Sequence, residues 1–574
     1  MFRSVSNVVD PALLKKFSDK MSLKLKRRST TRRKAILILW VILVSGMTRI
    51  YGTEKPNIIL IVADDMGYSD LGCYGGEIST PNLDKLAEEG MRFAQFYNQA
   101  VCAISRASFI SGTYPRFGTG PFLKPDMVTL ADVLATAGYA TILSGKWHLG
   151  DGANSPVNRG FQEFYGFEAG AVEYFDPLRR DPPFVNHSRP AFFFMHNRSP
   201  VSAVPDHYYV TDAITDHAIS QIEKYTRAHQ PFFLHVAFNA PHYPLQALPG
   251  DIAKYKGRYD AGYEELRKKR YEGAIKAGVI DRKWDLPPTD KKKSDFKYDQ
   301  EVRPWSMLTP GEQKAESARM EVYAAMVDRL DQNVGRLLTR LKQLKIEDNT
   351  IIIFFSDNGA CASVNTSPEN IARYHQYNKG KQPGGRDSYL FAGPGWATAQ
   401  SSPFRRYKVW TNEGGISTPM IVRWKGHVAA GTLTQTPMHL VDLMPTFMEL
   451  SGAVYPKQHH GVKILPYEGI SMMDVLENRP VQKERAFGWY LYGNKAYRKG
   501  KWKIIWGTGS EKWELYDMEN DRTETRDLSA RDPKRLKHLI SLWDKWAVRS
   551  QVPADDSAMI QQGSRIIRNP AKTR

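Results

Sequence analysis

Short apolar runs alternate along the chain with longer segments of helical periodicity. Four runs of four to seven residues are rich in aliphatic and aromatic side chains, at 58–62, 140–143, 232–238 and 351–355. Continuous apolar runs of this length are typical of strands buried on both faces of a sheet. Apolar residues over 315–344 recur at steps of three and four, which predicts a long amphipathic helix. Strands that alternate with helices predict an α/β fold, with a large, mostly parallel mixed sheet flanked by helices on both faces.

The pattern changes after about residue 480. Apolar runs at 486–491, 495–506 and 513–516 predict short antiparallel strands, and an amphipathic pattern over 533–548 predicts a closing helix. We therefore expect a smaller C-terminal α+β subdomain built on an antiparallel sheet. The predicted division is a leader over 1–52, a main domain over 53–480, the C-terminal subdomain over 481–552 and a disordered tail over 553–574.

The net charge of +19 is unevenly distributed. Residues 1–34 hold eleven Lys and Arg against two Asp, so nearly half of the excess belongs to the N-terminal leader. Basic residues up to Lys34 precede the apolar run 35–44 and the small residues Ser45 and Gly46, which is the order of an export signal. We expect an exported protein, periplasmic or secreted. An uncleaved anchor through this apolar run is the alternative, and it is the one membrane contact that we expect.

Other bulk features exclude some classes of function. The chain has no zinc-finger spacing and no RNP-like motif, so nucleic-acid binding is not expected. It has three cysteines, Cys73, Cys102 and Cys361, and this odd, low number argues against a disulfide scaffold. A single bridge between Cys73 and Cys361 stays open in an oxidising compartment. Cys102 alone would be interpreted as a small buried apolar residue.

Each of the four predicted strands is followed by polar residues. In parallel sheets, functional groups collect at the carboxyl edge, so we expect these side chains to converge. Carboxylate and amide oxygens are the ligands that Ca²⁺ and Mg²⁺ prefer, although acidic pairs and Asp-Asn-Gly also occur as caps and turns. The lysine and the histidines could likewise be solvated or structural. In strand order, the residues are Asp64 and Asp65, then Lys146 and His148, then His242, then Asp357 and Asn358.

The segment around Cys102 adds a second signal. It reads Cys-Ala-Ile-Ser-Arg-Ala-Ser-Phe-Ile-Ser-Gly over 102–112, which is similar to the signature of sulfatases. The chain as a whole resembles the sulfatase family of the alkaline-phosphatase superfamily, in its arylsulfatase-like branch. The resemblance runs in matching order from Pro56 to about Ala547. Its further motifs lie at 57–65, 80–84, 145–150, 240–242, 356–359, 403–408, 413–415 and 513–517.

The resemblance implies an enzyme that hydrolyses sulfate esters and releases inorganic sulfate. In the family, the cysteine matching Cys102 is oxidised by a formylglycine-generating enzyme to formylglycine, whose hydrate carries two hydroxyls. One hydroxyl, helped by the metal, attacks sulfur and expels the alcohol. The second hydroxyl lets the sulfated intermediate collapse to the aldehyde, a step that an unmodified cysteine cannot perform. The expected substrate is a sulfated small molecule or carbohydrate.

The resemblance also assigns roles to individual residues. Arg106 would hold the hydrated aldehyde and balance the carboxylates, and His148 would bind the hydroxyl that remains. Lys146, His242 and Lys408 would clamp the sulfate oxygens, and His242 or Lys408 would protonate the leaving oxygen. The expected ion is Ca²⁺, with Mg²⁺ as the alternative. Its ligands would be Asp64, Asp65, Asp357, Asn358 and an oxygen of the modified residue 102.

One position departs from the family pattern. Relatives carry proline two residues after the modified cysteine, whereas this chain has Ile104. Isoleucine is larger than the small replacements that the maturation enzyme tolerates, and it lacks the fixed φ of proline. The inferred binding residues are all retained, which argues against simple decay of the site.

Two other functions remain open. One is a phosphodiester or phosphonate ester hydrolase that uses the same formylglycine, because sulfate and phosphate oxygens present similar geometry and the fold does not settle function. The other is a non-catalytic protein that binds sulfated glycans through an unmodified Cys102. The substrate itself is not named by the sequence; we expect the loops 165–205 and 360–400 to select it.

Overall fold

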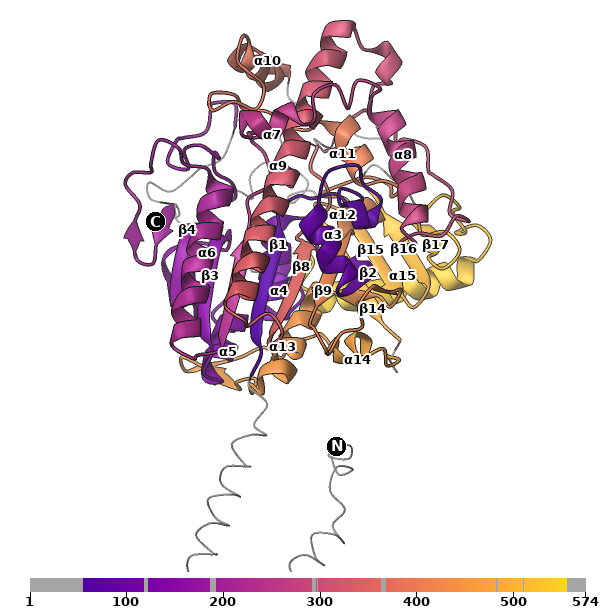
Figure 1. Ribbon diagram of the computed structural model, residues 1–574. Helices are drawn as coiled ribbons and strands as arrows, with labels where there is room; N and C mark the ends of the chain where they lie inside the picture. The colour runs from indigo at the N-terminus through magenta and orange to yellow at the C-terminus, as the bar shows by residue number, and fades with distance from the viewer. Residues whose placement is uncertain are drawn as a thin grey trace, which may run out of the picture. The chain divides into compact units, whose positions relative to one another are not determined.

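The computed structural model describes residues 55–117, 122–185, 193–291, 296, 298–362, 368–481, 484–508, 510 and 512–554 (Figure 1). The predicted export leader and nearly all of the predicted tail lie outside these residues and stay predictions. Within these ranges, no helix is both long and apolar enough to cross a membrane.

A single 11-stranded sheet organises the main part of the chain. Its strand order is β10-β2-β9-β8-β1-β7-β3-β4-β5-β6, with β11 also paired to β2. The central strands β8, β1, β7, β3 and β4 are parallel, whereas β9 runs antiparallel to β2 and β8. This confirms the predicted mixed, mostly parallel sheet. The bounds are β1 (Asn57–Ala63), β2 (Met91–Tyr97), β3 (Ala140–Lys146), β4 (Glu163–Phe167), β5 (Phe194–His196), β6 (Ser199–Pro200), β7 (Phe232–Ala237), β8 (Thr350–Ser356), β9 (Ser417–Arg423), β10 (Thr432–Thr434) and β11 (Met438–His439).

The central strand β1 is buried on both faces. Ile59 and Ile61 belong to one hydrophobic cluster, and Ile58, Leu60 and Val62 belong to the cluster on the opposite face. This division follows from the two-residue period of a strand. Full burial of a large aliphatic side chain contributes roughly 1.5–3 kcal/mol, so the run is held firmly in the middle of the molecule.

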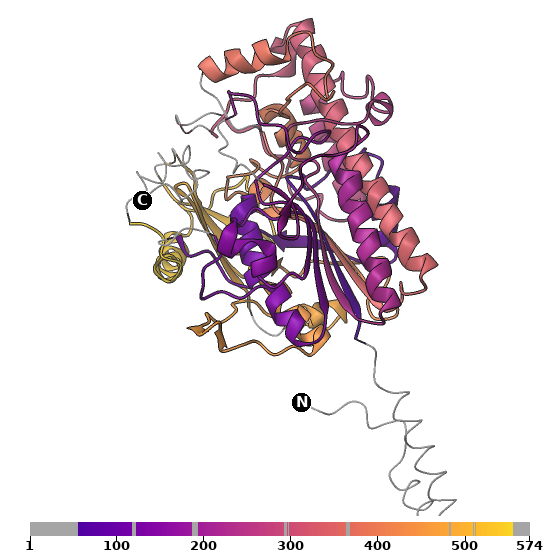
Figure 2. The ribbon, with the colours of Figure 1, turned by 90° about the vertical axis from the view of Figure 1, so that its left-hand side faces the viewer.

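Helices cover both faces of this sheet (Figures 1 and 2). Apolar side chains of α3 (Pro81–Glu88), α6 (Val210–Arg227) and α9 (Pro310–Gln343) belong to the first cluster. Those of α4 (Cys102–Ser111), α5 (Leu130–Thr136) and α13 (Leu443–Ser451) belong to the second. The remaining helices are α7 (Pro249–Ala253), α8 (Tyr263–Lys276), α10 (Pro368–Asn378), α11 (Pro394–Gln400), α12 (Glu413–Ile416), α14 (Met473–Leu476) and α15 (Pro533–Arg549), with short 3₁₀ turns η1 (Gly72–Tyr74), η3 (Gly152–Asn154), η4 (Pro156–Asn158), η5 (Trp305–Met307) and η6 (Leu440–Asp442).

The long helix α9 starts five residues before the apolar periodicity does. Thr309 Oγ1 accepts the Glu312 backbone N–H at 3.3 Å, and Glu312 Oε2 accepts the Thr309 N–H at 2.8 Å. This capping box, with Pro310 at the first helical position, defines the start. The first residues of α9 were not predicted because the apolar periodicity begins only where the helix reaches the hydrophobic core.

Two central strands, β2 and β9, were not predicted from the sequence. Pro419 interrupts β9, and a proline argues against a central strand because it cannot donate to the ladder. The structure accommodates it at a bulge, because the pairing between β2 and β9 jumps from Phe93–Met420 to Phe96–Thr418. Two residues of β2 thus lie opposite one residue of β9, and the missing N–H falls at this irregularity.

The C-terminal segment forms a separate antiparallel sheet, as predicted. Its order is β14 (Ala486–Leu491), β15 (Asn494–Lys499), β16 (Trp502–Trp506) and β17 (Glu514–Asp517), and α15 contacts the first three strands. The predicted single run 495–506 is a hairpin of two strands. The hairpin β12 (Gln458–His459) and β13 (Val462–Lys463) is a further small sheet. The predicted domain limit at residue 480 stays a prediction.

A buried ionic network joins the C-terminal sheet to α12. Lys503 Nζ lies 2.8 Å from Glu413 Oε1 and 2.7 Å from Glu524 Oε1, and Arg522 Nε donates to Glu413 Oε2 at 3.0 Å. All four side chains are fully buried. Since charges buried this deeply are costly unless paired, the network requires the two parts to meet in one arrangement.

Candidate functional site

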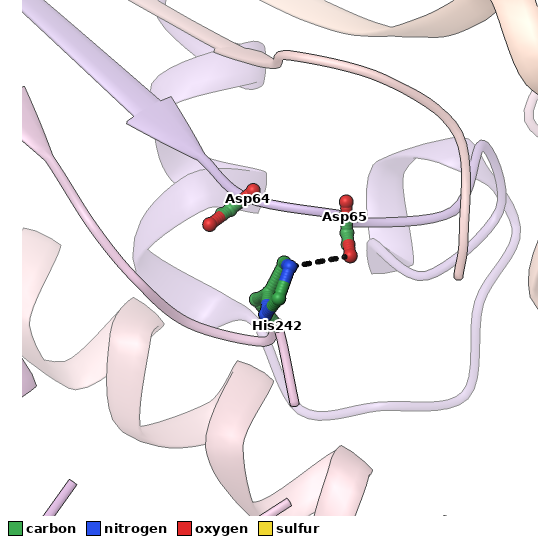
Figure 3. Close-up of side chains that lie close together, drawn as sticks. All are labelled: Asp64, Asp65 and His242. Atoms are coloured by element: carbon green, nitrogen blue, oxygen red, sulfur yellow. Dashed lines mark ion pairs between the residues drawn. The ribbon is translucent and has the colours of Figure 1, made fainter. Parts of the chain in front are cut away.

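The polar residues predicted after the strands do converge at one edge of the sheet. Figure 3 shows Asp64 and Asp65 at the end of β1 facing His242, which follows β7. The ligand atoms of these three side chains lie within 4.8 Å of one another, and all three residues are buried. Parallel strands bring their carboxyl ends to the same edge, which is the physical reason for this convergence.

The backbone at Asp65 is strained. Its φ is +68°, a left-handed conformation that non-glycine residues seldom adopt. The Asp65 N–H faces Asp357 Oδ1 at 3.4 Å, and Met66 N–H donates to Ser356 Oγ at 3.0 Å. These contacts from the end of β8 hold the turn, so the direction of the Asp65 carboxylate is fixed by two neighbouring strands.

Two lysines form short ion pairs with the two aspartates. Lys146 Nζ lies 2.5 Å from Asp64 Oδ2, and Lys408 Nζ lies 2.5 Å from Asp65 Oδ1. Burial raises the pKa of Asp64 to about 7, although Lys146 opposes this shift. Burial would also raise the pKa of Asp65, but Lys408 and His242 hold it below its ordinary value. The two carboxylates therefore differ in how strongly they are kept ionised.

Arg106 and Asp357 form a third buried pair. Arg106 Nε donates to Asp357 Oδ2 at 2.9 Å, and its NH1 donates to the Lys146 carbonyl at 3.1 Å. Arg106 lies on α4, whereas Lys146 ends β3 and Asp357 follows β8, and β1 and β7 lie between these two strands in the sheet. The arginine thus ties the helix that begins at Cys102 to the ends of β3 and β8.

Three buried oxygen atoms in the site have no hydrogen-bond partner. They are Asp64 Oδ1, Asp65 Oδ2 and Asn358 Oδ1. Asn358 is oriented by its Nδ2, which donates to Asp65 Oδ1 at 2.6 Å and to the Gly359 carbonyl at 2.9 Å. Buried acceptors without donors are costly, and a hard divalent cation would satisfy all three. The donor set therefore fits a metal of the Ca²⁺ or Mg²⁺ type.

The two predicted histidines differ in their polar contacts. His242 Nδ1 lies 2.6 Å from the Tyr243 carbonyl and His242 Nε2 lies 3.4 Å from Asp65 Oδ2, so Nε2 is the atom that faces the site. His148 has φ of +60° and its buried Nδ1 has no partner. Burial, with Lys146 and Arg106, lowers the pKa of His148 well below its ordinary value. His148 is thus a neutral imidazole with a free hydrogen-bonding atom.

Cys102 is the first residue of α4 and is only 4% exposed. Its Sγ lies 3.8 Å from Lys408 Nζ, so the thiol borders the same cluster. Burial raises the pKa of the thiol, against the effect of Lys146 and Lys408. The residues predicted to act in the chemistry or to bind metal therefore lie in this cluster or contact one of its members. For His148 the link is electrostatic, through Lys146 and Arg106.

Several residues near the site were not predicted. A Cβ on Gly170 would lie 2.7 Å from His148 Nε2, so this glycine makes room for the imidazole. Tyr174 donates its hydroxyl to the His242 carbonyl at 2.9 Å. Tyr492, in the turn between β14 and β15, has its pKa raised to about 12 by burial and by Cys102. Such contacts join segments that are distant in sequence, so no local sequence pattern indicates them.

The open question of a disulfide is answered by the structure. Cys73 and Cys361 are both free thiols, as is Cys102. Cys73 lies in η1, where its N–H donates to Asp84 Oδ1 at 2.7 Å. The environment of Cys361 is different, because burial and Asp65 raise its pKa well above the ordinary value. The Cys361 thiol is therefore influenced by Asp65, whereas the Cys73 backbone contacts Asp84.

The fold and this site define a class of protein. A mostly parallel sheet covered on both faces carries, at its carboxyl edge, a buried set of carboxylates, cations and one cysteine at a helix start. The oxygen atoms suit a divalent cation, and the lysines suit an anionic substrate. This is the arrangement of a hydrolase that acts on an anionic ester, with a candidate site for a metal ion.

Comparison with known proteins identifies the family. The sulfatase family model matches residues 56–453, and the model described as N-sulphoglucosamine sulphohydrolase, C-terminal, matches residues 406–546. The chain belongs to the sulfatase family. It is a sulfuric ester hydrolase of the arylsulfatase-like kind.

Relatives and solved structures agree with this assignment. An uncharacterized sulfatase of Schizosaccharomyces pombe is 34% identical, over 86% of this chain and 93% of the relative. An arylsulfatase of Klebsiella aerogenes is 32% identical, over 77% of this chain and 96% of the relative. A crystal structure of Ps i-CgsB in complex with k-i-k-neocarrahexaose has a TM-score of 0.62 and 26% identity, and covers 90% of this chain and 98% of that one.

Proposed function

We propose that this protein hydrolyses sulfate esters through a formylglycine formed from Cys102, at a site that holds a divalent cation. The observation that carries the proposal is the position of Cys102. Its Sγ lies 3.8 Å from Lys408 Nζ, and Lys408 in turn pairs with Asp65, whose other carboxylate oxygen accepts no hydrogen bond. A nucleophile at residue 102 would therefore stand between an unsatisfied set of oxygen ligands and fixed positive charge.

The residues proposed to hold the cation are Asp64, Asp65, Asp357 and Asn358, together with an oxygen of the modified residue 102. Calcium is the proposed ion because of the family, and the oxygen donors alone also suit Mg²⁺. When bound, the cation supplies positive charge that polarises the sulfate oxygens and favours an ionised nucleophile. When formed, the formylglycine hydrate supplies one hydroxyl for attack on sulfur and a second for release of sulfate.

The cationic side chains bind and orient the substrate. Lys146 Nζ and Lys408 Nζ are both buried at the site, where fixed charges interact strongly with the developing negative charge of a sulfuryl group. Arg106 balances Asp357 and keeps the first turn of α4 in place. Fixed cations at both sides of residue 102 would hold a sulfate group with its ester oxygen directed outward.

The two histidines handle protons in this proposal. His148 offers an unpartnered Nδ1 for the hydroxyl that remains on residue 102. His242 presents Nε2 to the site, and it or Lys408 would give a proton to the leaving oxygen. The two alternatives differ in the pH profile of kcat, because an imidazole and an ammonium group titrate in different ranges.

The substrate class that we propose is a sulfated carbohydrate. Ps i-CgsB, whose fold and sequence are similar, was crystallised with a neocarrahexaose. The C-terminal match to the N-sulphoglucosamine sulphohydrolase model points to the same class of compound. Aryl sulfates serve as simple test substrates because their release is easily followed.

The first test is the chemical state of residue 102. The protein would be produced in a host with a formylglycine-generating system and digested with trypsin, which yields the peptide from Phe93 to Arg106. We expect this peptide to be lighter than its sequence predicts, by the replacement of a thiol with an aldehyde. We also expect sulfate release from an aryl sulfate, which Cys102→Ala abolishes.

Other outcomes would redirect the assignment. Unmodified cysteine in protein from the native source, with retention of sulfated glycans but no sulfate release, would establish the binding-protein alternative. Faster turnover of an aryl phosphonate ester than of the aryl sulfate would establish the phosphonate hydrolase alternative.

We further propose that the protein is exported, on the basis of the basic and apolar leader that ends before residue 52. Fractionation of the native source, with N-terminal sequencing of the mature protein, tests this. A start near residue 50 in the exported fraction supports a cleaved signal, whereas an intact leader in the membrane fraction supports an anchor.

A further inference from the structure

A second polar cavity lies beside α10 and shares no residue with the site around Cys102. Its volume is about 460 Å³. It is lined by side chains from the start of α9, by one side of α10, and by the loop that follows α10 as far as Leu390. Figures 1 and 2 show α10 at the same end of the molecule as the start of α9. This cavity is called the α10 cavity below.

The lining of the α10 cavity is basic. It includes Arg319, Lys379 and Lys381, with His375 beside them, and among the residues that the structure describes it contains no Asp or Glu. A larger cavity, lined in part by Arg282 and Lys283, is different because it is also lined by Asp281, Glu484 and Glu519. A one-signed lining attracts anions, whereas a mixed lining largely neutralises itself.

The cations of this lining differ in whether they form an ion pair. Arg319 NH1 is paired with Glu316 Oε1 at 2.7 Å. Lys379 and Lys381, by contrast, form no ion pair with any residue that the structure describes. Lys381 Nζ lies 3.2 Å from the centre of the Tyr377 ring, which orients the ammonium group, and the carboxylates of Asp387 and Glu173 act on its charge without forming an ion pair with it.

A continuous row of rings connects the α10 cavity to the catalytic site. Tyr374, which lines the cavity, stacks on Phe391 at 5.3 Å between ring centroids. Phe391 contacts Tyr243 at 4.9 Å, and Tyr243 contacts His242 at 4.1 Å. The α10 cavity and the site around Cys102 are thus separated by three ring contacts between buried side chains, so they are close neighbours in the fold.

We propose that the α10 cavity is a second binding site for sulfate groups on a polysulfated carbohydrate chain whose ester is cleaved at residue 102. This inference rests on the proposed function, because it names the same substrate class and adds a second point of attachment. Lys379 and Lys381 would bind sulfate groups that are not being hydrolysed. A substrate with one sulfate group cannot occupy both positions, so the cavity would select for highly sulfated chains.

The test compares two substrates in charge-reversed variants of the full-length, formylglycine-containing enzyme. In the variant Lys379→Glu/Lys381→Glu, we expect KM for a polysulfated hexasaccharide to rise about tenfold at low salt, and the difference to shrink in high salt. The kinetics on a monosulfated aryl ester should stay within about twofold, because this ester cannot reach the cavity. The neutral variant Lys379→Gln/Lys381→Gln should show a smaller rise.

A matched control reverses the same number of charges elsewhere. Lys534 and Lys537 are exposed residues of α15 and form no ion pair with any described residue, so Lys534→Glu/Lys537→Glu changes net charge equally. We expect this control to behave like the wild type on both substrates. An unchanged KM for the hexasaccharide in the cavity variants, or an equal effect of the control, would overturn the proposal. So would an equal loss on the aryl ester.

A binding measurement separates this proposal from the proposed function. Calorimetric titration of the wild type and the cavity variants with the hexasaccharide requires no turnover. If neither ester is hydrolysed but charge reversal still weakens hexasaccharide binding, the proposed function fails and the α10 cavity stands. If an oligonucleotide of equal charge binds as tightly and responds equally to the variants, the assignment to carbohydrate is overturned.

Discussion

At Asp65, the backbone conformation and the side-chain contacts together set the direction of the carboxylate. The residue adopts φ of +68°, an arrangement that costs of order 1–3 kcal/mol for a non-glycine residue. In return its carboxylate meets Lys408 at one oxygen and leaves the other oxygen open to the site. Strain of this kind persists only where surrounding contacts fix it, and here Asn358 and Ser356 at the end of β8 do so.

Substitution at Ile104 tests the one departure from the family motif. Ile104 is the third residue of α4, so its N–H is one of the first four that have no helical acceptor, and the first helical bond is from Ser105 N to Val101 O. Proline is tolerated there. We expect Ile104→Pro to increase the fraction of formylglycine at residue 102, measured on the tryptic peptide, while the free energy of unfolding falls by about 1 kcal/mol from lost packing.

The control for this prediction is Ile104→Val, which keeps an apolar side chain without the fixed φ of proline. It should leave the formylglycine fraction unchanged. Equal conversion in all three proteins would mean that the residue at this position does not limit maturation.

Gly170→Ala tests the role of His148. The added Cβ would lie 2.7 Å from His148 Nε2, so the imidazole must move, while Gly170 has an ordinary φ and its backbone accepts alanine. We expect kcat to fall at least about tenfold, by displacement of a proton-transfer group, with little change in melting temperature. Gly250→Ala, where nothing lies within 4 Å of the new Cβ, is the control. A large loss of stability with unchanged kcat per folded molecule would contradict this role.

At the scale of elements, the ends of β1, β3, β7 and β8 bring the site together, and α12 is joined to the C-terminal sheet. The connection between these parts is polar. Burial would raise the pKa of Glu413, but Lys503 and Arg522 hold it at about 2, so this carboxylate stays ionised in the interior. The ionic network at Lys503 therefore joins α12 to the C-terminal sheet through fully buried, paired charges.

Substitution of Lys503 tests whether the buried ionic network contributes to stability. Lys503→Met leaves Glu413 and Glu524 without their shared cation in a fully buried position, and we expect the free energy of unfolding to fall by about 3–5 kcal/mol. Lys512→Met, which removes an exposed pair with Asp527 in the same subdomain, should cost less than about 1 kcal/mol. Denaturant titration of both variants measures the difference. Similar effects would show that the buried network contributes no more than a surface pair.

For the whole molecule, a bound cation should link function to stability. The open oxygens of Asp64, Asp65 and Asn358 come from β1 and β8, so an ion there would stabilise the folded state and not the unfolded chain. We expect a chelator to lower the melting temperature and Ca²⁺ to restore it; an ion present at a hundredfold excess over its Kd stabilises by about 2.7 kcal/mol. Scanning calorimetry of dialysed protein measures this.

The variant Asp64→Asn/Asn358→Leu supplies the control, because it removes ligand oxygen atoms at both strand ends. Its melting temperature should no longer respond to Ca²⁺. A response that persists in this variant would place the stabilising ion elsewhere in the molecule.

Much of this protein was determined by local sequence patterns. The apolar runs that became β1, β3, β7 and β8 were predicted because strands buried on both faces need continuous apolar side chains, and α15 was predicted from its periodicity. The polar residues at the ends of these strands were named because a charged group directly after such a strand is placed at the carboxyl edge. Cys102, Arg106 and Lys408 were named through the resemblance to the sulfatase family.

Only the tertiary structure decided the rest. Strand β9 was missed because Pro419 is acceptable solely where β2 forms a bulge opposite it. The approach of Lys408 to Cys102, the room that Gly170 leaves for His148 and the basic lining of the α10 cavity each join segments distant in sequence. Sequence periodicity records which face of an element is buried, whereas contacts between elements depend on how those faces pack, and no local pattern encodes that.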